Sequence, residues 1–394
     1  MKRRPIITNA ALLIGSVLVA LVVAEIALHA LAPKKYFTWQ PNLRVTFTPS
    51  PEIMPGVSGP SHFQINADGL RGEPIPAGSA YRVLTVGGST TECLYLDEAK
   101  TWPRQLQDRL SARGATNRAW VGNLGKSGLT SRNHVLQLER QLPDCPKLAA
   151  VVMLVGCNDL LLRLAQDDGY RPFNFGTPEP EAYEALLYQS FNVLPRQALP
   201  SGRFYQQTEL QRLVGGLKRR FGKPPQDLSG KIYVTWREYR QHAPRVRETL
   251  PDLKPALDEY ASNLGRLIEL CRKHGARPLL VTQPALWRAG LSKTEEALLW
   301  MGGVGDFMNQ AGCEYYSVTA LASAMEQYNE ALRRVCREQS ADCIDLAAAL
   351  PKDTTVFYDD VHFNERGAQR VAEVIADYLA RHPAPHVSQT MSRP

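Results

Sequence analysis

The sequence predicts an α/β fold built on a doubly wound, mostly parallel five-stranded sheet with helices on both faces. Five short apolar runs, partly β-branched, predict the strands: Arg82–Val86, Ala119–Asn123, Leu148–Val155, Pro278–Thr282 and Cys343–Leu346. These runs are apolar throughout rather than alternating, which indicates strands that are buried on both faces. Helical patterns of about ten residues or more separate the runs, and this alternation is typical of a parallel sheet.

The helices of this fold are predicted between and after the strands. Their patterns cover Trp102–Arg113, Arg132–Leu142, Leu257–His274, Leu321–Arg337 and the closing helix Glu365–Ala380. With 394 residues, of which 44% are hydrophobic and 22% charged, the chain can bury a substantial core. We therefore predict that residues 81–382 form the main domain.

Residues 161–253 interrupt the alternation of strands and helices. They contain segments rich in proline, glycine and aromatic residues, and we interpret them as an insertion or cap over the sheet. Ligands of open α/β sheets bind beyond the carboxyl ends of the strands. An insertion after the third strand would lie beside that crevice, either as a lid or as a surface for a partner.

The N-terminus predicts a membrane anchor over residues 1–32. Basic residues at positions 2–4 precede the apolar stretch Ile6–Ala32, and Ala10–Ala24 has no charge. A helix rising about 1.5 Å per residue over this stretch can cross the ~30 Å hydrocarbon layer. The basic end favours a short cytoplasmic tail, with the body exported. Secretion after signal cleavage is the alternative, and Pro33 disfavours it because it directly follows the candidate cleavage site.

The remaining regions and the composition limit the kinds of partner. Residues 33–80 are rich in Pro and Gly and are predicted as a juxtamembrane stalk and lead-in to the domain, and residues 383–394 as a disordered tail. The net charge of +7 is mild, and no long basic run with interleaved aromatics occurs, so we expect no nucleic-acid partner. The seven cysteines fit an oxidising compartment, and their pairing stays open.

Ser89 is the candidate nucleophile. It lies in Gly87–Thr90, directly after the first predicted strand. The two glycines allow a tight turn, and the following helix N-terminus offers free N–H groups that can stabilise negative charge. The alternative is an ordinary strand–helix turn with a Ser or Thr cap. Neither the Walker phosphate-loop pattern nor the Gly-x-Ser-x-Gly elbow is present in the sequence.

Two further turns supply candidate hydrogen-bond donors. Gly128 ends the turn after the second predicted strand, and Asn158 follows the third strand and carries an amide NH₂ group. Together with the Ser89 N–H, these donors could form an oxyanion hole. The alternatives are a plain turn and an Asx cap, and we interpret Asp159 as such a cap.

His362 is the candidate general base. Unlike the other histidines of the chain, it has a carboxylate three residues before it, that of Asp359. This acid could fix the imidazole tautomer and leave the other ring nitrogen free to take the serine proton. Asp360 could replace Asp359, and the alternative for His362 is a plain surface loop. No His or Cys spacing typical of zinc sites occurs, so we expect neither a metal nor a cofactor.

These stretches together resemble the SGNH hydrolase superfamily, also called GDSL-like esterases. The four family blocks occur in order: Gly87–Thr90, the turn ending at Gly128, Gly156–Asp159 and Asp359–His362. The resemblance implies that Ser89 is the nucleophile, His362 the base and Asp359 the acid that orients it. It also implies an oxyanion hole formed by Ser89, Gly128 and Asn158. The usual Gly-Asp-Ser is Gly-Gly-Ser here, so we expect Gly88 to change how the turn is held.

The chain also looks like a bacterial membrane-anchored subgroup in which a Gly-Leu-Arg-Gly stretch, here within Asn66–Gly72, precedes the first strand. The resemblance then implies a serine esterase at the bacterial inner membrane, with its body on the periplasmic or extracellular side. The leading expectation is hydrolysis of O-acetyl or other short acyl groups on an envelope or extracellular glycan. The alternatives are a glycan O-acyltransferase, a lipid esterase or thioesterase, and a non-catalytic envelope assembly module.

Overall fold

The computed structural model describes residues 3–31, 34–78, 81–113, 118–195, 208, 210 and 227–383. At its centre lies a sheet of five strands: β3 (Tyr81–Gly87), β4 (Ala119–Asn123), β5 (Leu148–Leu154), β7 (Arg277–Val281) and β9 (Asp342–Ile344). The strand order is β4-β3-β5-β7-β9, and every neighbouring pair is parallel. The predicted five-stranded parallel sheet is confirmed.

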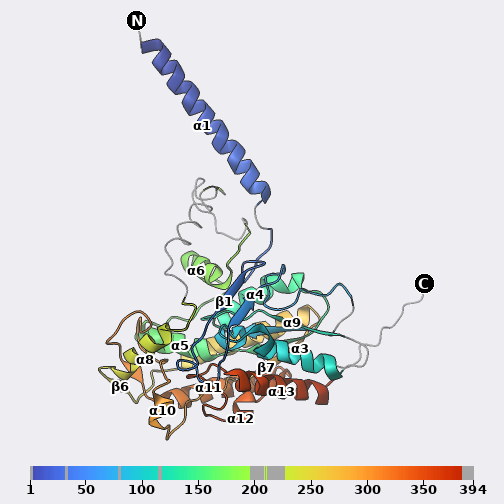
Figure 1. Ribbon diagram of the computed structural model, residues 1–394, viewed down its shortest axis with the longest axis vertical. Helices are drawn as coiled ribbons and strands as arrows, with labels where there is room; N and C mark the ends of the chain where they lie inside the picture. Colours follow the sequence, from blue (N-terminus) through green and yellow to red (C-terminus); the bar gives the residue numbers. More distant parts are fainter. Residues whose placement is uncertain are drawn as a thin grey trace, which may run out of the picture.

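The connections between these strands place helices on both faces of the sheet (Figure 1). The chain leaves β3 through α3 (Trp102–Arg113) to reach β4, and returns through α4 (Ser131–Gln141) to β5 on the other side of β3. Because such crossovers are right-handed, α3 and α4 lie on opposite faces. In agreement, α3 packs against α13 (Glu365–Arg381), whereas α4 packs against α9 (Lys254–Lys273), which also contacts α11 (Val318–Glu338).

The strand interiors are buried as their apolar sequences predict. Val83, Leu84 and Val86 of β3 have no exposed surface, and the same holds for Val151 and Val152 of β5. The predicted and observed strand ends differ by at most two residues, and those of β4 coincide. The largest difference is at β9, which ends at Ile344 because Asp345 instead caps α12 (Leu346–Ala349), its side chain accepting from the Ala348 N–H.

Segments outside the sheet add several short elements. The short helices are α2 (Ser89–Glu92), η1 (Glu98–Lys100), η2 (Leu142–Asp144) and α10 (Lys293–Glu296). The predicted insertion 161–253 begins inside α5 (Cys157–Gln166) and includes η3 (Asp167–Gly169), α6 (Pro180–Ser190), α8 (Ile232–Gln241) and β6 (Val246–Arg247). Strand β6 pairs in parallel with β8 (Tyr315–Tyr316), and α6 packs on α4. Most of residues 196–226 lie outside the described part of the chain.

The prediction of a stalk over residues 33–80 is wrong for most of this segment. Strands β1 (Arg44–Phe47) and β2 (Ser61–Gln64) form an antiparallel pair. The side chains of Phe47, Met54 and Phe63 are at most 1% exposed and belong to the main hydrophobic core. The prolines and short strands hide this packing in the sequence, because only a few apolar residues alternate at a time.

Helix α1 (Arg3–Leu31) extends away from the rest of the protein, with Leu12, Leu13 and Val19 more than half exposed (Figure 1). Among the residues that the structure describes, no helix meets the length and hydropathy requirements of a membrane crossing. The predicted anchor, residues 1–32, and the predicted tail, residues 383–394, both extend beyond these residues.

Candidate active site

Ser89, His362 and Asp359 form a continuous chain of hydrogen bonds. His362 Nε2 lies 2.7 Å from Ser89 Oγ, and His362 Nδ1 lies 2.7 Å from Asp359 Oδ2. Ser89 opens α2 directly after β3, and the other two residues lie in the loop before α13. The structure thus brings together the three residues that the sequence singles out, in an arrangement suited to transferring a proton from the serine to the imidazole.

Asp359, and not Asp360, faces the imidazole. Asp359 Oδ1 accepts hydrogen bonds from the backbone N–H groups of Val361 and His362, at 3.0 and 2.8 Å. The carboxylate of Asp360 turns to other donors, namely the Trp287 indole and the Trp300 backbone N–H, each at 2.8 Å. Of the two aspartates that the sequence left open, the geometry places Asp359 in the orienting position.

The electrostatics of the pair favour a protonatable imidazole beside a charged carboxylate. Burial lowers the pKa of His362, but the charge of Asp359 and its hydrogen bond outweigh burial, so that the pKa is raised. Burial raises the pKa of Asp359, but His362 and the indole of Trp300 outweigh it, and the pKa is lowered. Asp359 therefore stays ionised when His362 accepts a proton, which stabilises the imidazolium.

Neither of the two glycines before Ser89 has free space for a side chain. A Cβ at Gly87 would lie 2.4 Å from the Leu154 carbonyl oxygen of the neighbouring strand β5. A Cβ at Gly88 would lie 2.4 Å from Asn158 Nδ2. The Gly-Gly-Ser sequence therefore leaves the space that the Asn158 amide occupies next to the nucleophile.

The predicted oxyanion-hole donors lie around the same cleft as Ser89. Ser89, Gly128, Asn158 and His362 all line it. Gly128 adopts φ +76°, a left-handed conformation that glycine accepts without steric cost. One N–H of the Asn158 amide donates to the Leu129 carbonyl at 2.8 Å, and an NH₂ group has a second proton to offer. The arrangement can place three donors near an ester carbonyl bound at Ser89.

Asp159, which the sequence suggested as a helix cap, has a different contact. It accepts hydrogen bonds from the Ser131 N–H at 3.0 Å and from the Ser131 hydroxyl at 2.5 Å. Burial raises the pKa of Asp159 to about 6. Asp159 thus links the start of α5 to the start of α4.

The cleft has a volume of about 720 Å³, which lies in the range of small-molecule sites. Its walls come from the turn before α4, from α5 and α6, from α8, and from residues 300–308. Most lining side chains are apolar, among them Leu161, Leu186, Trp236, Phe307 and Met308. The predicted insertion therefore borders the site, as expected from its place after the third strand of the sheet.

Trp300 and Tyr233 are site residues that sequence reasoning missed. The indole Nε1 of Trp300 donates to Asp359 Oδ2 at 3.0 Å, and Tyr233 packs edge-on against the His362 ring. Both side chains are less than a tenth exposed. They lie in segments whose sequences show no periodic pattern. The one feature that could have indicated them is the concentration of aromatic residues in these segments, far from any predicted strand.

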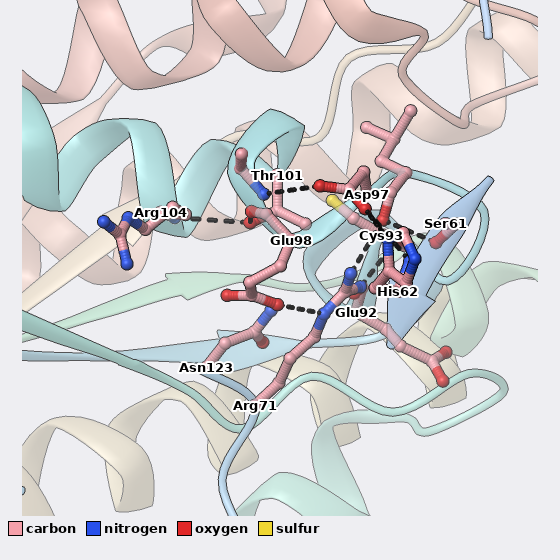
Figure 2. A network of polar contacts seen from close by, with 12 residues as sticks. Ser61, His62, Arg71, Glu92, Cys93, Asp97, Glu98, Thr101, Arg104 and Asn123 are labelled. Carbon is pink, nitrogen blue, oxygen red and sulfur yellow. Dashed lines mark hydrogen bonds and ion pairs between the residues drawn. The ribbon is translucent and has the colours of Figure 1, made fainter. Parts of the chain in front are cut away.

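A buried arginine supports the helix that begins with Ser89 (Figure 2). Arg71 is 1% exposed, and its guanidinium donates to the carbonyls of Glu92, Cys93 and Leu96 and to the Glu98 carboxylate. The last carbonyls of a helix lack partners within the helix, and a cation satisfies them favourably. The segment Asn66–Gly72, noted in the sequence, thus fixes the far end of α2.

No group of three His, Cys, Asp or Glu side chains suited to hold a metal ion occurs among the residues with described placement. Cys93 and Cys157 lie close to the site in sequence, but burial raises the pKa of both thiols. Thiols with a raised pKa are poor nucleophiles, because the thiolate is the reactive form.

Comparison with known proteins places this geometry in a family context. The GDSL-like lipase/acylhydrolase family matches residues 85–370 of the chain. A search of curated proteins gave no match.

Several solved structures are similar to the chain at low identity. An acetylxylan esterase from Geobacillus stearothermophilus shares 14% identity, with 76% of this chain and 94% of that chain covered and a TM-score of 0.40. An α/β hydrolase enzyme from the metagenome of Lake Arreo, Spain, shares 14% identity, with 77% and 95% covered and a TM-score of 0.39. A putative lipolytic protein of the G-D-S-L family from Desulfitobacterium hafniense shares 10% identity, with 75% and 98% covered and a TM-score of 0.38.

Proposed function

The chain belongs to the GDSL-like lipase/acylhydrolase family of the SGNH hydrolase superfamily and is a serine esterase, and from this premise we propose that Ser89, His362 and Asp359 form its catalytic triad. The observation that carries the assignment is the 2.7 Å contact between His362 Nε2 and Ser89 Oγ. The second contact, from His362 Nδ1 to Asp359, fixes the tautomer that this role requires.

The first half of the proposed reaction forms an acyl-enzyme. Ser89 Oγ attacks the ester carbonyl carbon while His362 Nε2 takes the hydroxyl proton. The negative charge on the carbonyl oxygen is stabilised by the Ser89 and Gly128 N–H groups and by the Asn158 amide. When the tetrahedral intermediate collapses, the carbon–oxygen bond to the alcohol breaks, and His362 returns its proton to the leaving alkoxide.

The second half of the reaction releases the acyl group. A water molecule gives a proton to His362 and attacks the acyl carbon of Ser89, again with the oxyanion held by the same three donors. Collapse of this intermediate frees the carboxylic acid and restores the Ser89 hydroxyl with the proton from His362. Asp359 stays ionised throughout and stabilises the imidazolium in both halves.

For the substrate, we propose an O-acetyl or other short acyl group on a glycan of the cell envelope or the cell exterior. The export-type N-terminus supports this location. The cleft volume of about 720 Å³ far exceeds the needs of a short acyl group, so the leaving group has room within it. Trp236 and Trp300 lie stacked at 4.5 Å between ring centroids in this cleft, and flat aromatic rings suit packing against a sugar.

An ester or thioester with a longer apolar chain is the second candidate. The apolar side chains of α5 and α6 that line the cleft, such as Leu161, Leu162 and Leu186, support it. Burying an acyl chain against these side chains would stabilise the complex by about 0.8 kcal/mol for each methylene group.

We further propose that α1 anchors the esterase domain to the outer side of the bacterial cytoplasmic membrane. The exposed apolar side chains of α1 and the basic residues 2–4 at its N-terminal end support this placement. Recovery of the intact N-terminus from a membrane fraction that resists alkaline extraction tests the anchor. A mature chain that begins after residue 32 would contradict it.

The esterase function is tested with the full-length protein in detergent. Aryl esters from acetate to dodecanoate are compared for the wild type and Ser89→Ala. We expect turnover only by the wild type, with kcat/KM highest for acetate. Equal rates for both proteins would refute the triad, and a maximum at long chains would favour the second candidate. Acylated product formed in the presence of an acceptor sugar would identify a transferase.

A further inference from the structure

The turn that carries Gly128 is tied at its first end to a buried carboxylate. Glu92, the last residue of α2, is 1% exposed. Its Oε2 atom accepts a hydrogen bond from the Ser127 N–H at 2.8 Å and another from the Ser127 hydroxyl. A carboxylate held away from water needs such donors to offset the lost hydration. Glu92 therefore joins the residue before Gly128 to the helix that begins with Ser89.

The other end of the same turn has a matching contact. Asp159, which follows Asn158 at the start of α5, accepts hydrogen bonds from the N–H and the hydroxyl of Ser131. The Ser131 hydroxyl also accepts from the Asn263 amide at 2.9 Å. Residues 127–131 are thus held at both ends by a carboxylate that binds the N–H and the hydroxyl of a serine.

In the middle of this segment, the N–H and the hydroxyl of Thr130 both donate to Asn133 Oδ1, at 3.0 and 2.9 Å, whereas Gly128 has fewer constraints. A Cβ added to Gly128 would have no atom within 4 Å apart from those of its chain neighbours, so packing against side chains does not fix the position of Gly128. The Leu129 carbonyl accepts the 2.8 Å hydrogen bond from Asn158 Nδ2. The direction of the Gly128 N–H therefore depends on the ends of the turn, on this contact and on the Thr130–Asn133 hydrogen bonds.

We propose that Glu92 and Asp159 are positioning residues that hold residues 127–131 so that the Gly128 N–H and the Asn158 amide converge on the oxyanion. Each carboxylate comes from an element that carries another part of the site, Glu92 from the helix of Ser89 and Asp159 from the helix of Asn158. This inference rests on the proposed triad and oxyanion hole and adds the two residues that set their spacing.

The buried arginine of Figure 2 extends the arrangement on the Glu92 side. Arg71 donates to the Glu92 carbonyl at 2.5 Å and to the Cys93 carbonyl at 2.8 Å. Asn123 Nδ2 donates to the Thr91 carbonyl at 2.8 Å, and a Cβ at Gly125 would lie 2.3 Å from the Glu92 backbone nitrogen. The backbone of Glu92 is therefore fixed, so its carboxylate can act as a rigid support for Ser127.

The test compares Glu92→Gln, Glu92→Ala, Asp159→Asn and Asp159→Ala in the full-length protein with an aryl acetate as the substrate. Loss of one oxyanion donor typically costs about 10²–10³ in rate. We expect kcat to fall by about 10²-fold in the alanine variants and about tenfold in the amide variants, which keep one acceptor oxygen. KM should change by less than about threefold, because the oxyanion contacts act mainly in the transition state.

Asp97→Asn is the matched control. Asp97 lies on the loop after α2, and it accepts hydrogen bonds from the backbone of His62 and Ala99 rather than from the turn. We expect this variant to keep wild-type kcat. Hydrogen exchange of the peptide that covers residues 126–132 gives a readout that does not depend on catalysis. This exchange should become faster in the four variants of Glu92 and Asp159 but not in Asp97→Asn.

Two results would overturn the inference. Wild-type kcat in folded Glu92→Ala and Asp159→Ala would contradict it while leaving the triad intact. Unchanged exchange of residues 126–132 in these variants would do the same even where their activity is lost. If the wild type itself hydrolysed no ester and matched Ser89→Ala, the proposed function would fail first, and the positioning role would fall with it.

Discussion

Trp300 donates its indole N–H to the same Asp359 oxygen, Oδ2, that contacts the imidazole of His362. The indole lies 3.0 Å from that oxygen, and His362 Nδ1 lies 2.7 Å from it. Trp300 thus adds a donor to a carboxylate that is fully buried. A charged acceptor in such surroundings forms strong hydrogen bonds, and each fixes its orientation. Asp359, the proposed acid of the triad, is therefore oriented by an aromatic residue from a distant part of the chain.

Replacing Trp300 by phenylalanine should impair catalysis more than binding. Trp300→Phe keeps an aromatic ring but removes the N–H donor, so that Asp359 is held less firmly and its pKa rises. Hydrogen bonds to charged groups are worth about 1.5–3 kcal/mol, and we expect kcat to fall by about tenfold. Steady-state kinetics with an aryl acetate measure this change.

Trp287→Phe is the control for that variant, because the Trp287 indole donates to Asp360 instead, at 2.8 Å. It removes the same group from the neighbouring aspartate. A loss of kcat as large in Trp287→Phe as in Trp300→Phe would show that general destabilisation, and not the contact with Asp359, explains the effect.

The two adjacent aspartates should differ in what their amide variants lose. Asp359→Asn places an uncharged group beside the imidazole and should lower kcat by about 10³–10⁴-fold with a small effect on folding. Asp360→Asn leaves one of its buried N–H donors facing an NH₂ group and should lower the free energy of unfolding by about 1–3 kcal/mol. Kinetics and thermal unfolding of both variants give the comparison, and a reversed pattern would assign the orienting role to Asp360.

The pH dependence of kcat/KM should have an acidic limb above the usual imidazole pKa. Burial lowers the pKa of His362, but the neighbouring Asp359 raises it beyond this effect, to above the usual 6.5. His362 must be neutral to take the proton of Ser89, so activity is low below this pKa and increases as the pH rises through it. A profile recorded from pH 5 to pH 9 that reaches its plateau below pH 6.5 would contradict this assignment.

The sheet could be predicted from the sequence because its strands are apolar on both faces and helical patterns separate them. Helix ends were less predictable, since caps decide them: α11 begins at Val318 because the Ser317 side chain accepts from the Ala320 N–H. Residues 44–64 were mistaken for part of a stalk. The two strands have four residues each, which is too short to show a periodic pattern, and a proline-rich segment separates them.

The candidate site could be predicted where its residues directly follow strands. Ser89, Gly128 and Asn158 come after β3, β4 and β5, whose carboxyl ends meet at one edge of the sheet. Trp300 and Glu92 could not be found in this way. Trp300 lies in a long connection without periodicity, and the proposed role of Glu92 depends on Ser127, which only the folded turn brings to it.

Adding a side chain at position 88 should disturb the oxyanion hole. In Gly88→Ala the new Cβ would lie 2.4 Å from Asn158 Nδ2, closer than non-bonded atoms can approach, so the Asn158 amide must move. Since Asn158 is a proposed donor to the oxyanion, we expect kcat to fall by about 10²-fold, and Gly88→Asp, which restores the usual family sequence, should fall at least as far. Gly78→Ala is the control, because a Cβ there meets nothing within 4 Å. Wild-type kcat in Gly88→Ala would show that the Asn158 amide can shift without cost, and the close packing of residues 88 and 158 would then have no part in catalysis.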